Sequence, residues 1–129
     1  MSATPVVLLV EDNERNLKLA RDVLEHAGFT VTVACTGEEA VERATEALPD
    51  VILMDLQLPG IDGHAALGRL RDDPRTAGIP VVALTALAMR QDRERATRSG
   101  FDGFLEKPIS VREFPGQVRR YLRGEEGRP

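Results

Sequence analysis

Short apolar runs alternate with longer amphipathic runs along this chain of 129 residues. Three runs are almost wholly apolar: 6–10 (VVLLV), 51–54 (VILM) and 80–84 (PVVAL). Such runs are typical of parallel strands that helices cover on both faces. The run 29–34 (FTVTVA) instead alternates apolar residues with threonine, which predicts an edge strand with one face more exposed to solvent. Residues 103–106 predict a fifth, weaker strand.

Five helices are predicted between and after these strands, from apolar residues spaced three and four apart. We expect them at about 17–27 before Gly28, 40–47 with a Thr36–Glu39 capping box, 63–71 with Asp62 as N-cap, 89–98 before Gly100, and 110–122 with a Ser110–Glu113 capping box. Pro115 and Gly116 are unfavourable inside the last helix. We retain that helix because the proline falls near its first turn.

Five strand–helix units in succession predict an α/β fold with a five-stranded parallel sheet and right-handed crossovers. The length suits one domain of ordinary size. We expect a single domain over residues 1–129, with its core at about 5–123 and a short polar tail at 124–129. The sequence contains no internal repeat or low-complexity linker.

Composition excludes several classes of function. The net charge is −4, no block of lysine and arginine stands out, and aromatic residues make up only 4%. Binding to nucleic acid is therefore disfavoured. No apolar stretch approaches the roughly 20 residues that span a bilayer, and the start of the chain lacks a signal-peptide pattern. We expect a cytoplasmic protein without membrane contact. Cys35 is the only cysteine, so no internal disulfide can form, and we expect its side chain to be at least half-buried.

Reactive side chains follow the predicted strands. Glu11 and Asp12 follow the first strand, Asp55 the third, Thr85 the fourth and Lys107 the fifth. The carboxyl ends of parallel strands share one edge of the sheet, where ligands bind. Three carboxylates there would repel one another unless a cation is present, and Mg²⁺ prefers oxygen ligands. An aspartate held beside a metal and a lysine can act as a nucleophile toward phosphorus.

Four segments together resemble a known family: VLLVEDN (7–13), VILMDLQLPGIDG (51–63), PVVALTA (80–86) and FLEKPIS (104–110). They look like the receiver domain of bacterial two-component response regulators, in the CheY-like superfamily. The spacings of 30 residues from Asp55 to Thr85 and 52 to Lys107 fit the family. VEDNERNLKLA and LTALAMRQDRERA look most like single-domain regulators of the DivK type, or like receiver modules of hybrid kinases. The resemblance implies the strand order 2-1-3-4-5.

The resemblance also implies roles for individual residues. Asp55 would accept the phosphoryl group, and Lys107, preceding a cis bond to Pro108, would pair with that group. Mg²⁺ would be bound by the carboxylates of Glu11, Asp12 and Asp55 and by the backbone carbonyl of Gln57. The switch would consist of Thr85 and the backbone N–H of Ala86, which bind the phosphoryl oxygens, and of Phe104, which moves inward with Thr85.

The implied function is a phosphorylation-controlled protein–protein switch rather than an enzyme, with self-phosphorylation and weak autophosphatase chemistry. A sensor histidine kinase or a histidine phosphotransfer protein would donate the phosphoryl group. The signal would leave through the face formed by the fourth helix, fifth strand and last helix, about 89–98, 103–106 and 110–122. Alternatively, the chain is the receiver module of a hybrid kinase, or a phosphorelay intermediate.

Two enzyme or carrier classes with a related fold fit less well. A haloacid-dehalogenase-type phosphatase needs a second aspartate two residues after the nucleophile as general acid, and Gln57 cannot donate that proton. A flavodoxin-like flavin carrier needs a first loop that cradles phosphate, which the acidic residues of 11–14 (EDNE) would repel. His64 has no second metal-type ligand nearby in sequence, and we interpret it as an exposed residue early in a helix.

Overall fold

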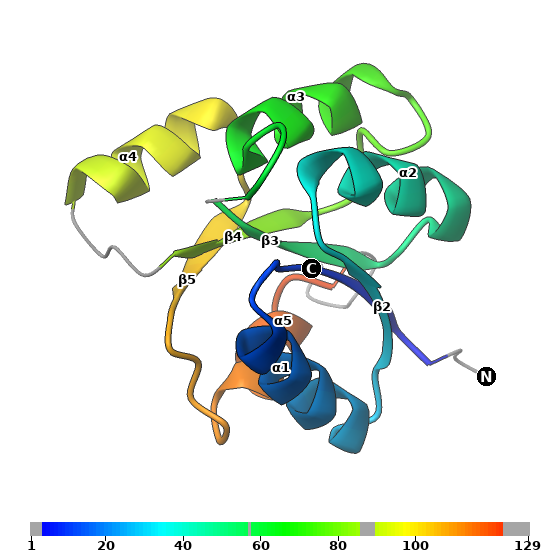
Figure 1. Ribbon diagram of the computed structural model, residues 1–129, viewed down its shortest axis with the longest axis vertical. Coiled ribbons are helices and arrows are strands. Elements are labelled where there is room, and N and C mark those ends of the chain that lie inside the picture. Colours follow the sequence, from blue (N-terminus) through cyan, green and yellow to red (C-terminus); the bar gives the residue numbers. More distant parts are fainter. Residues whose placement is uncertain (1–3, 57, 86–89, 123–129) are drawn as a thin grey trace.

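The computed structural model describes residues 4–56, 58–85 and 90–122. Its five strands form one parallel sheet in the order β2-β1-β3-β4-β5 (Figure 1), which confirms the expected topology. The strands are β1 (Val6–Val10), β2 (Thr30–Ala34), β3 (Val51–Asp55), β4 (Val81–Thr85) and β5 (Gly103–Glu106). The alternating run lies at an edge of the sheet, as its pattern predicts.

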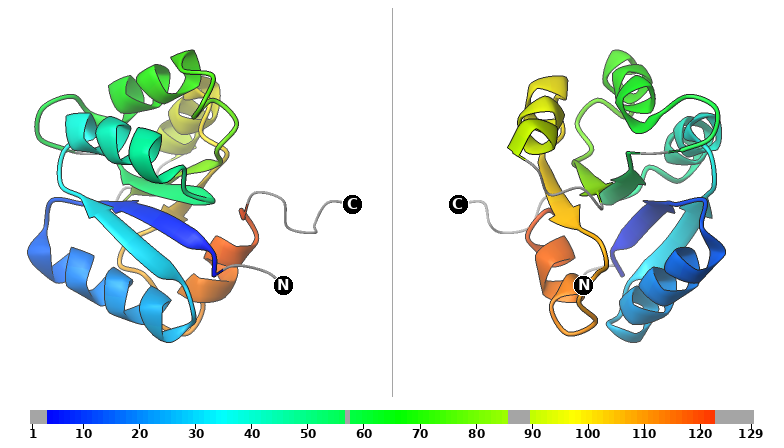
Figure 2. Two further views of the ribbon diagram at one scale, coloured as in Figure 1. Left: turned by 90° about the vertical axis from the view of Figure 1, so that its right-hand side faces the viewer. Right: turned by 60° about the vertical axis from the view of Figure 1, so that its left-hand side comes forward.

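Helices cover both faces of this sheet. They are α1 (Glu14–His26), α2 (Gly37–Ala47), α3 (Gly63–Asp72), α4 (Arg90–Ser99) and α5 (Phe114–Arg119). One face carries α1 and α5, and the other carries α2, α3 and α4; Figure 2 shows the same two layers from further sides. Among the described residues, the structure has no helix of the length and apolar character that crossing a bilayer requires.

Alternate residues of the central strands fill two separate apolar cores. In β1, Leu8 and Val10 pack in the core beneath α2 and α3, whereas Val7 and Leu9 pack in the core beneath α1 and α5. The strands β3 and β4 divide their side chains in the same way. Because both faces are buried, these strands read as continuous apolar runs in the sequence.

The starts of the strands are joined by two matching pairs of hydrogen bonds. The carboxylate of Asp50 accepts from the amide of Val6 at 2.8 Å, and the amide of Asp50 donates to the Val6 carbonyl at 2.8 Å. Asp102 forms the same two bonds with Val81, each at 2.8 Å. In each pair, the aspartate just before one strand satisfies the first backbone groups of its neighbour, at the edge opposite the reactive residues.

Two helices begin with the expected side-chain caps. The Asp62 carboxylate accepts from the Ala65 amide at the start of α3, and Thr36 accepts from the Glu39 amide at the start of α2. In a capping box, the Glu39 carboxylate would accept a hydrogen bond from the Thr36 amide. Here it instead accepts from the amide of Cys35, one residue earlier, at 2.7 Å. Glycines at 28 and 100, with φ of 99° and 101°, follow α1 and α4 in the left-handed conformation.

Three sequence expectations differ from the structure. The last helix spans Phe114–Arg119 and not 110–122, because Pro115 has no N–H to donate within a helix and is accommodated in its first turn. Ser110 caps only the preceding turn, where its hydroxyl accepts from the Glu113 amide. The side chain of Cys35 is exposed rather than half-buried, since it follows the edge strand β2. The proposed start of the fourth helix at Met89 and the tail 124–129 lie outside the described residues.

Candidate functional site

Asp55 is the last residue of β3, and its side chain is buried although it carries a carboxylate. Residues 51–54 have no exposed surface, and Asp55 is 6% exposed. It stands opposite Leu84 of β4 in the register of the sheet. The buried strand therefore ends in a carboxylate held on a rigid element at the carboxyl edge of the sheet.

Glu11 and Asp12 lie beside this carboxylate. Glu11 directly follows β1 and is 3% exposed, whereas Asp12 is exposed. The Glu11 amide donates to the carbonyl of Ala34, and one of its carboxylate oxygens accepts from the Asn13 amide at 3.2 Å. One oxygen from each of Glu11, Asp12 and Asp55 lies within 4.8 Å of the others. The predicted acidic cluster is therefore formed.

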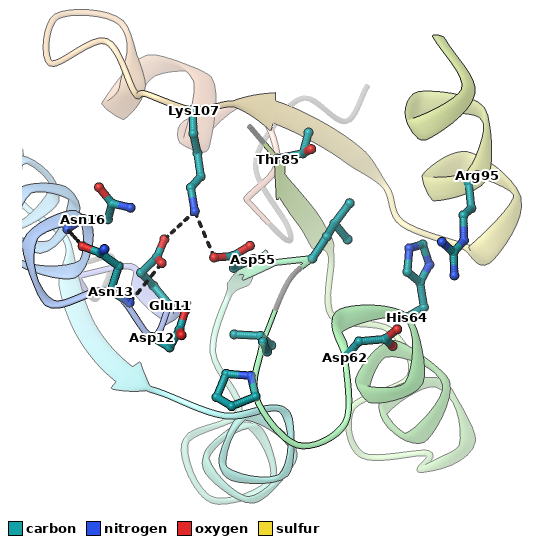
Figure 3. A pocket seen from close by; sticks show the side chains of 13 residues that line it. Glu11, Asp12, Asn13, Asn16, Asp55, Asp62, His64, Thr85, Arg95 and Lys107 are labelled. Atoms are coloured by element: carbon teal, nitrogen blue, oxygen red, sulfur yellow. Dashed lines mark hydrogen bonds and ion pairs between the residues drawn. The ribbon is translucent and has the colours of Figure 1, made fainter. Parts of the chain in front are cut away.

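Lys107 connects two of these carboxylates. Its Nζ lies 2.9 Å from Oδ2 of Asp55 and 3.0 Å from Oε1 of Glu11 (Figure 3). The Lys107 amide donates to the Thr85 carbonyl at 2.8 Å, which attaches the end of β5 to the end of β4. Lys107 precedes the expected cis peptide bond to Pro108. One ammonium group, from the residue that follows β5, thus bridges carboxylates at the ends of β1 and β3.

The electrostatics of the site follow from this burial. Burial raises the pKa of the Glu11 carboxyl, and the nearby negative charge of Asp55 raises it further. The hydrogen bond from Lys107 opposes this, but the pKa of Glu11 still lies above its usual value. For Lys107, burial alone would lower the pKa, but hydrogen bonds to Asp55 and Glu11 outweigh it and raise the pKa above its ordinary value. Lys107 is therefore a fixed positive charge at neutral pH.

These residues line one side of an open cavity of about 740 Å³. Thr85, which is 8% exposed, contributes to the wall from the end of β4. The opposite wall carries Asp62, His64 and Arg95 from the helices α3 and α4 (Figure 3). Asp55 can therefore be reached from outside through this cavity.

The donor set of the cluster fits a hard divalent cation. Three carboxylates converge, and Mg²⁺ is usually held by a few carboxylates together with water. Lys107 neutralises part of the charge but bonds to only two of the three carboxylates. Asp12, exposed at the mouth of the cavity, would be accessible to the ion. Gln57 and Ala86, whose backbone groups the resemblance assigned to metal and phosphoryl, lie outside the described residues.

Phe104 does not lie in this cavity. It is the second residue of β5, half-buried, and it packs against the core beneath α2 and α3. Its outer side faces a shallow hollow shared with Glu94, Thr97 and Arg98 of α4. The expected switch pair is therefore divided between the site, where Thr85 lies, and the face formed by α4 and β5.

The sequence interpretation of His64 as an exposed residue was wrong. His64 is half-buried, lines the cavity, and has its Nδ1 2.8 Å from the hydroxyl of Ser99 at the end of α4. Burial, and then the positive charge of Arg95, lower its pKa, against a smaller opposing effect of Asp62. No local pattern could reveal this contact, because 35 residues separate the two side chains in the chain.

Comparison with known proteins agrees with this geometry. The family model of the response regulator receiver domain matches residues 7–119. The chain belongs to this family. The receiver domain is 44% identical over 119 residues to the polar-differentiation response regulator DivK of Brucella ovis, covering 92% of this chain and 97% of that protein.

Solved structures give the same result. The receiver domain superposes on chemotaxis protein CheY4 of Vibrio cholerae with a TM-score of 0.87 at 27% identity, covering 93% of this chain and 100% of the other. It also matches the receiver domain of sensor histidine kinase PA1611 from Pseudomonas aeruginosa, with a TM-score of 0.85 and 35% identity over 92% of this chain and 98% of the other. That structure has a magnesium ion coordinated in its active site cleft.

Proposed function

We propose that the receiver domain accepts a phosphoryl group on Asp55 from a sensor histidine kinase or a histidine phosphotransfer protein, in a reaction that depends on Mg²⁺. The observation that carries this proposal is the bridge of Lys107 Nζ to the buried carboxylates of Asp55 and Glu11. The bridge holds the Asp55 carboxylate in place and supplies a positive charge where the phosphoryl oxygens would arrive.

The transfer step follows from this arrangement. A carboxylate oxygen of Asp55 forms a bond to phosphorus while the bond from phosphorus to the donor nitrogen breaks, and the electron pair of that bond stays on the donor imidazole. Lys107 would stabilise the charge on the transferred oxygens, and Thr85 would donate a hydrogen bond to one of them. Glu11, Asp12 and Asp55 would hold Mg²⁺, which neutralises phosphoryl charge when bound.

The output is a change in protein–protein contact at the face formed by α4, β5 and α5. Thr85 ends β4, and Phe104 lies on the neighbouring strand β5 against α4. A movement of Thr85 toward a phosphoryl group would leave space that the Phe104 ring can enter. The protein would then act as a single phosphorylation-regulated unit over residues 1–129, in the cytoplasm, where its phosphodonors act.

A second candidate is a receiver module that passes the phosphoryl group on within a hybrid kinase or phosphorelay. The 35% identity to the receiver domain of a sensor histidine kinase favours it. The two candidates share the chemistry at Asp55 and differ in the fate of the phosphoryl group. Transfer from labelled Asp55 to a histidine phosphotransfer protein would favour the relay, whereas phosphorylation-dependent retention of a non-phosphorylated partner would favour the switch.

The chemistry is tested by incubation with acetyl phosphate and Mg²⁺, followed by mass spectrometry of the intact chain and of its peptides. We expect one phosphoryl group, mapped to Asp55 and labile to hydroxylamine, and no labelling when the metal is chelated beforehand. The Asp55→Asn variant keeps the shape but removes the anionic nucleophile, so it should not be labelled. Asp62→Asn is the matched control, since it alters a carboxylate on the opposite cavity wall and asparagine caps a helix equally well. Labelling of Asp55→Asn at the rate of the control would refute the proposal.

A further inference from the structure

One side chain joins the cavity around Asp55 to the end of α4. His64, the second residue of α3, lines this cavity, and its Nδ1 lies 2.8 Å from Oγ of Ser99, the last residue of α4. Its ring also makes a T-shaped contact with the ring of Phe101, with centroids 5.5 Å apart and planes at 86°. Figure 3 shows the imidazole beside Arg95 on the wall of the cavity that faces the acidic cluster.

The hydrogen bond between these residues does not depend on one protonation state. When Nδ1 carries no proton, it accepts from the Ser99 hydroxyl; when it carries one, it donates to the hydroxyl oxygen. The contact with Phe101, which is 6% exposed, keeps the imidazole ring in one orientation. The link therefore persists while the charge of the cavity changes.

A second link, between α3 and the residues that follow α4, serves as an internal comparison. Arg71 lies two helical turns after His64 on the same face of α3, and its guanidinium donates to the Gly100 carbonyl at 3.2 Å and to the Asp102 carboxylate at 2.8 Å. It also donates to the carbonyls of Ala77 and Ile79. Arg71 does not line the cavity around Asp55. The two links act at the end of α4 and just beyond it, and of the two only the one through His64 reaches the reactive site.

We infer that His64 is a positioning residue that connects the phosphorylation cavity to the output helix α4 through its hydrogen bond to Ser99. This inference rests on the proposed function, because it concerns how the phosphoryl group on Asp55 affects α4. A phosphoryl group changes the charge and the volume available within the cavity that His64 lines. Any displacement of the imidazole is transmitted to Ser99, since the two side chains share a hydrogen bond.

The inference is tested by NMR spectroscopy of the full chain, with and without phosphorylation by phosphoramidate and Mg²⁺. The measured quantity is the change in amide chemical shifts at residues 97–100, with the phosphorylated fraction of Asp55 determined by mass spectrometry. Ser99→Ala removes the hydroxyl but leaves the cavity wall intact. We expect it to be phosphorylated like the wild type, with shift changes at 97–100 reduced by at least half. Ser99→Thr retains the hydroxyl and should restore them.

Two further variants separate this role from a general effect on stability. His64→Leu fills the space of the ring without Nδ1 and should reduce the response at 97–100 as Ser99→Ala does. Arg71→Lys keeps the charge but loses the forked bonds of the guanidinium, so it should lower the melting temperature while the response at 97–100 persists.

Shift changes of wild-type size at 97–100 in fully phosphorylated Ser99→Ala would overturn the inference. So would a failure of Ser99→Ala alone to accept phosphate, because Ser99 would then affect the chemistry rather than its transmission. A wild type that gains no phosphoryl group would instead refute the proposed function, and the inference with it. The mass measurement distinguishes these outcomes in each sample.

Discussion

The ammonium group of Lys107 lies 2.9 Å from Oδ2 of Asp55, although 52 positions separate the two residues in the chain. The same group lies 3.0 Å from Glu11, whose side chain is 4% exposed. Lys107→Met keeps the length of the side chain and removes its charge. We expect the free energy of unfolding to fall by about 2 kcal/mol, because two largely buried carboxylates lose their shared cation.

Urea denaturation at neutral pH, with and without Mg²⁺, measures this effect. Mg²⁺ should recover part of the stability lost in Lys107→Met, since the ion can replace the missing positive charge. The control is Lys18→Met, which removes an exposed lysine that pairs with Asp22 on the surface of α1; we expect a change well under 1 kcal/mol there. Equal stability of the two variants would show that the bridge at Asp55 does not stabilise the fold.

The acidic cluster should make stability depend on Mg²⁺. Asp12 is exposed, so Asp12→Asn relieves repulsion in the metal-free protein at little cost in packing, and its melting temperature without metal should exceed that of the wild type. Mg²⁺ at about ten times its dissociation constant should stabilise the wild type by about 1.4 kcal/mol and have little effect on the variant. Thermal melts with Asp22→Asn as control test this. A wild type that is insensitive to Mg²⁺ would contradict the assigned metal site.

Thr85 should be required for signalling more than for chemistry. Shifting a two-state equilibrium from 1:99 to 99:1 takes about 5.5 kcal/mol, more than one hydrogen bond contributes. Lys107 and the metal must therefore contribute as well, or the shift is partial. We expect Thr85→Ala to be phosphorylated at Asp55 but to show reduced shift changes across α4, β5 and α5, and Thr85→Ser to behave as the wild type. If the largest distant changes fall on α1 and α2, the output face is assigned wrongly.

The pKa of His64 predicts a loss of stability in weak acid. Burial, together with the charge of Arg95, lowers this pKa below the ordinary value of 6.5, against the opposing charge of Asp62. The unfolded chain therefore binds a proton at His64 more readily than the folded chain does. The contribution of His64 to the free energy of unfolding is present above pH 6.5, and it is lost as pH falls through the lower pKa of the folded state. His64→Asn removes this term, and urea denaturation between pH 8 and pH 5 should show a shallower decline. An identical pH profile for both proteins would contradict it.

The sequence predicts those parts of the molecule that depend on local chain properties. Continuous apolar runs identify strands buried on both faces, and the position of Asp55 directly after such a run places it at the sheet edge. Pro115 shows where apolar periodicity fails as a predictor. The apolar pattern extends over 110–122, but the helix spans only Phe114–Arg119, because proline has no N–H to donate within a helix. The His64–Ser99 contact shows another limit: only the packing of α3 against α4 brings these two ordinary side chains together.

The two pairs of hydrogen bonds at the strand starts have a consequence for the reactive edge. Strands that are apolar on both faces could slip by one residue with little loss of burial, since each face would remain apolar. The hydrogen bonds between Val6 and Asp50 fix β1 against β3 at one end of the strands. At the other end, Glu11 follows Val6 by five residues and Asp55 follows Asp50 by five residues. Asp102 and Lys107 have the same separation. A slip of one residue, about 3.3 Å, would carry Asp55 out of reach of the ammonium group. The hydrogen bonds at the strand starts thus set the register of the strands, and this register determines where the reactive groups lie at the opposite edge.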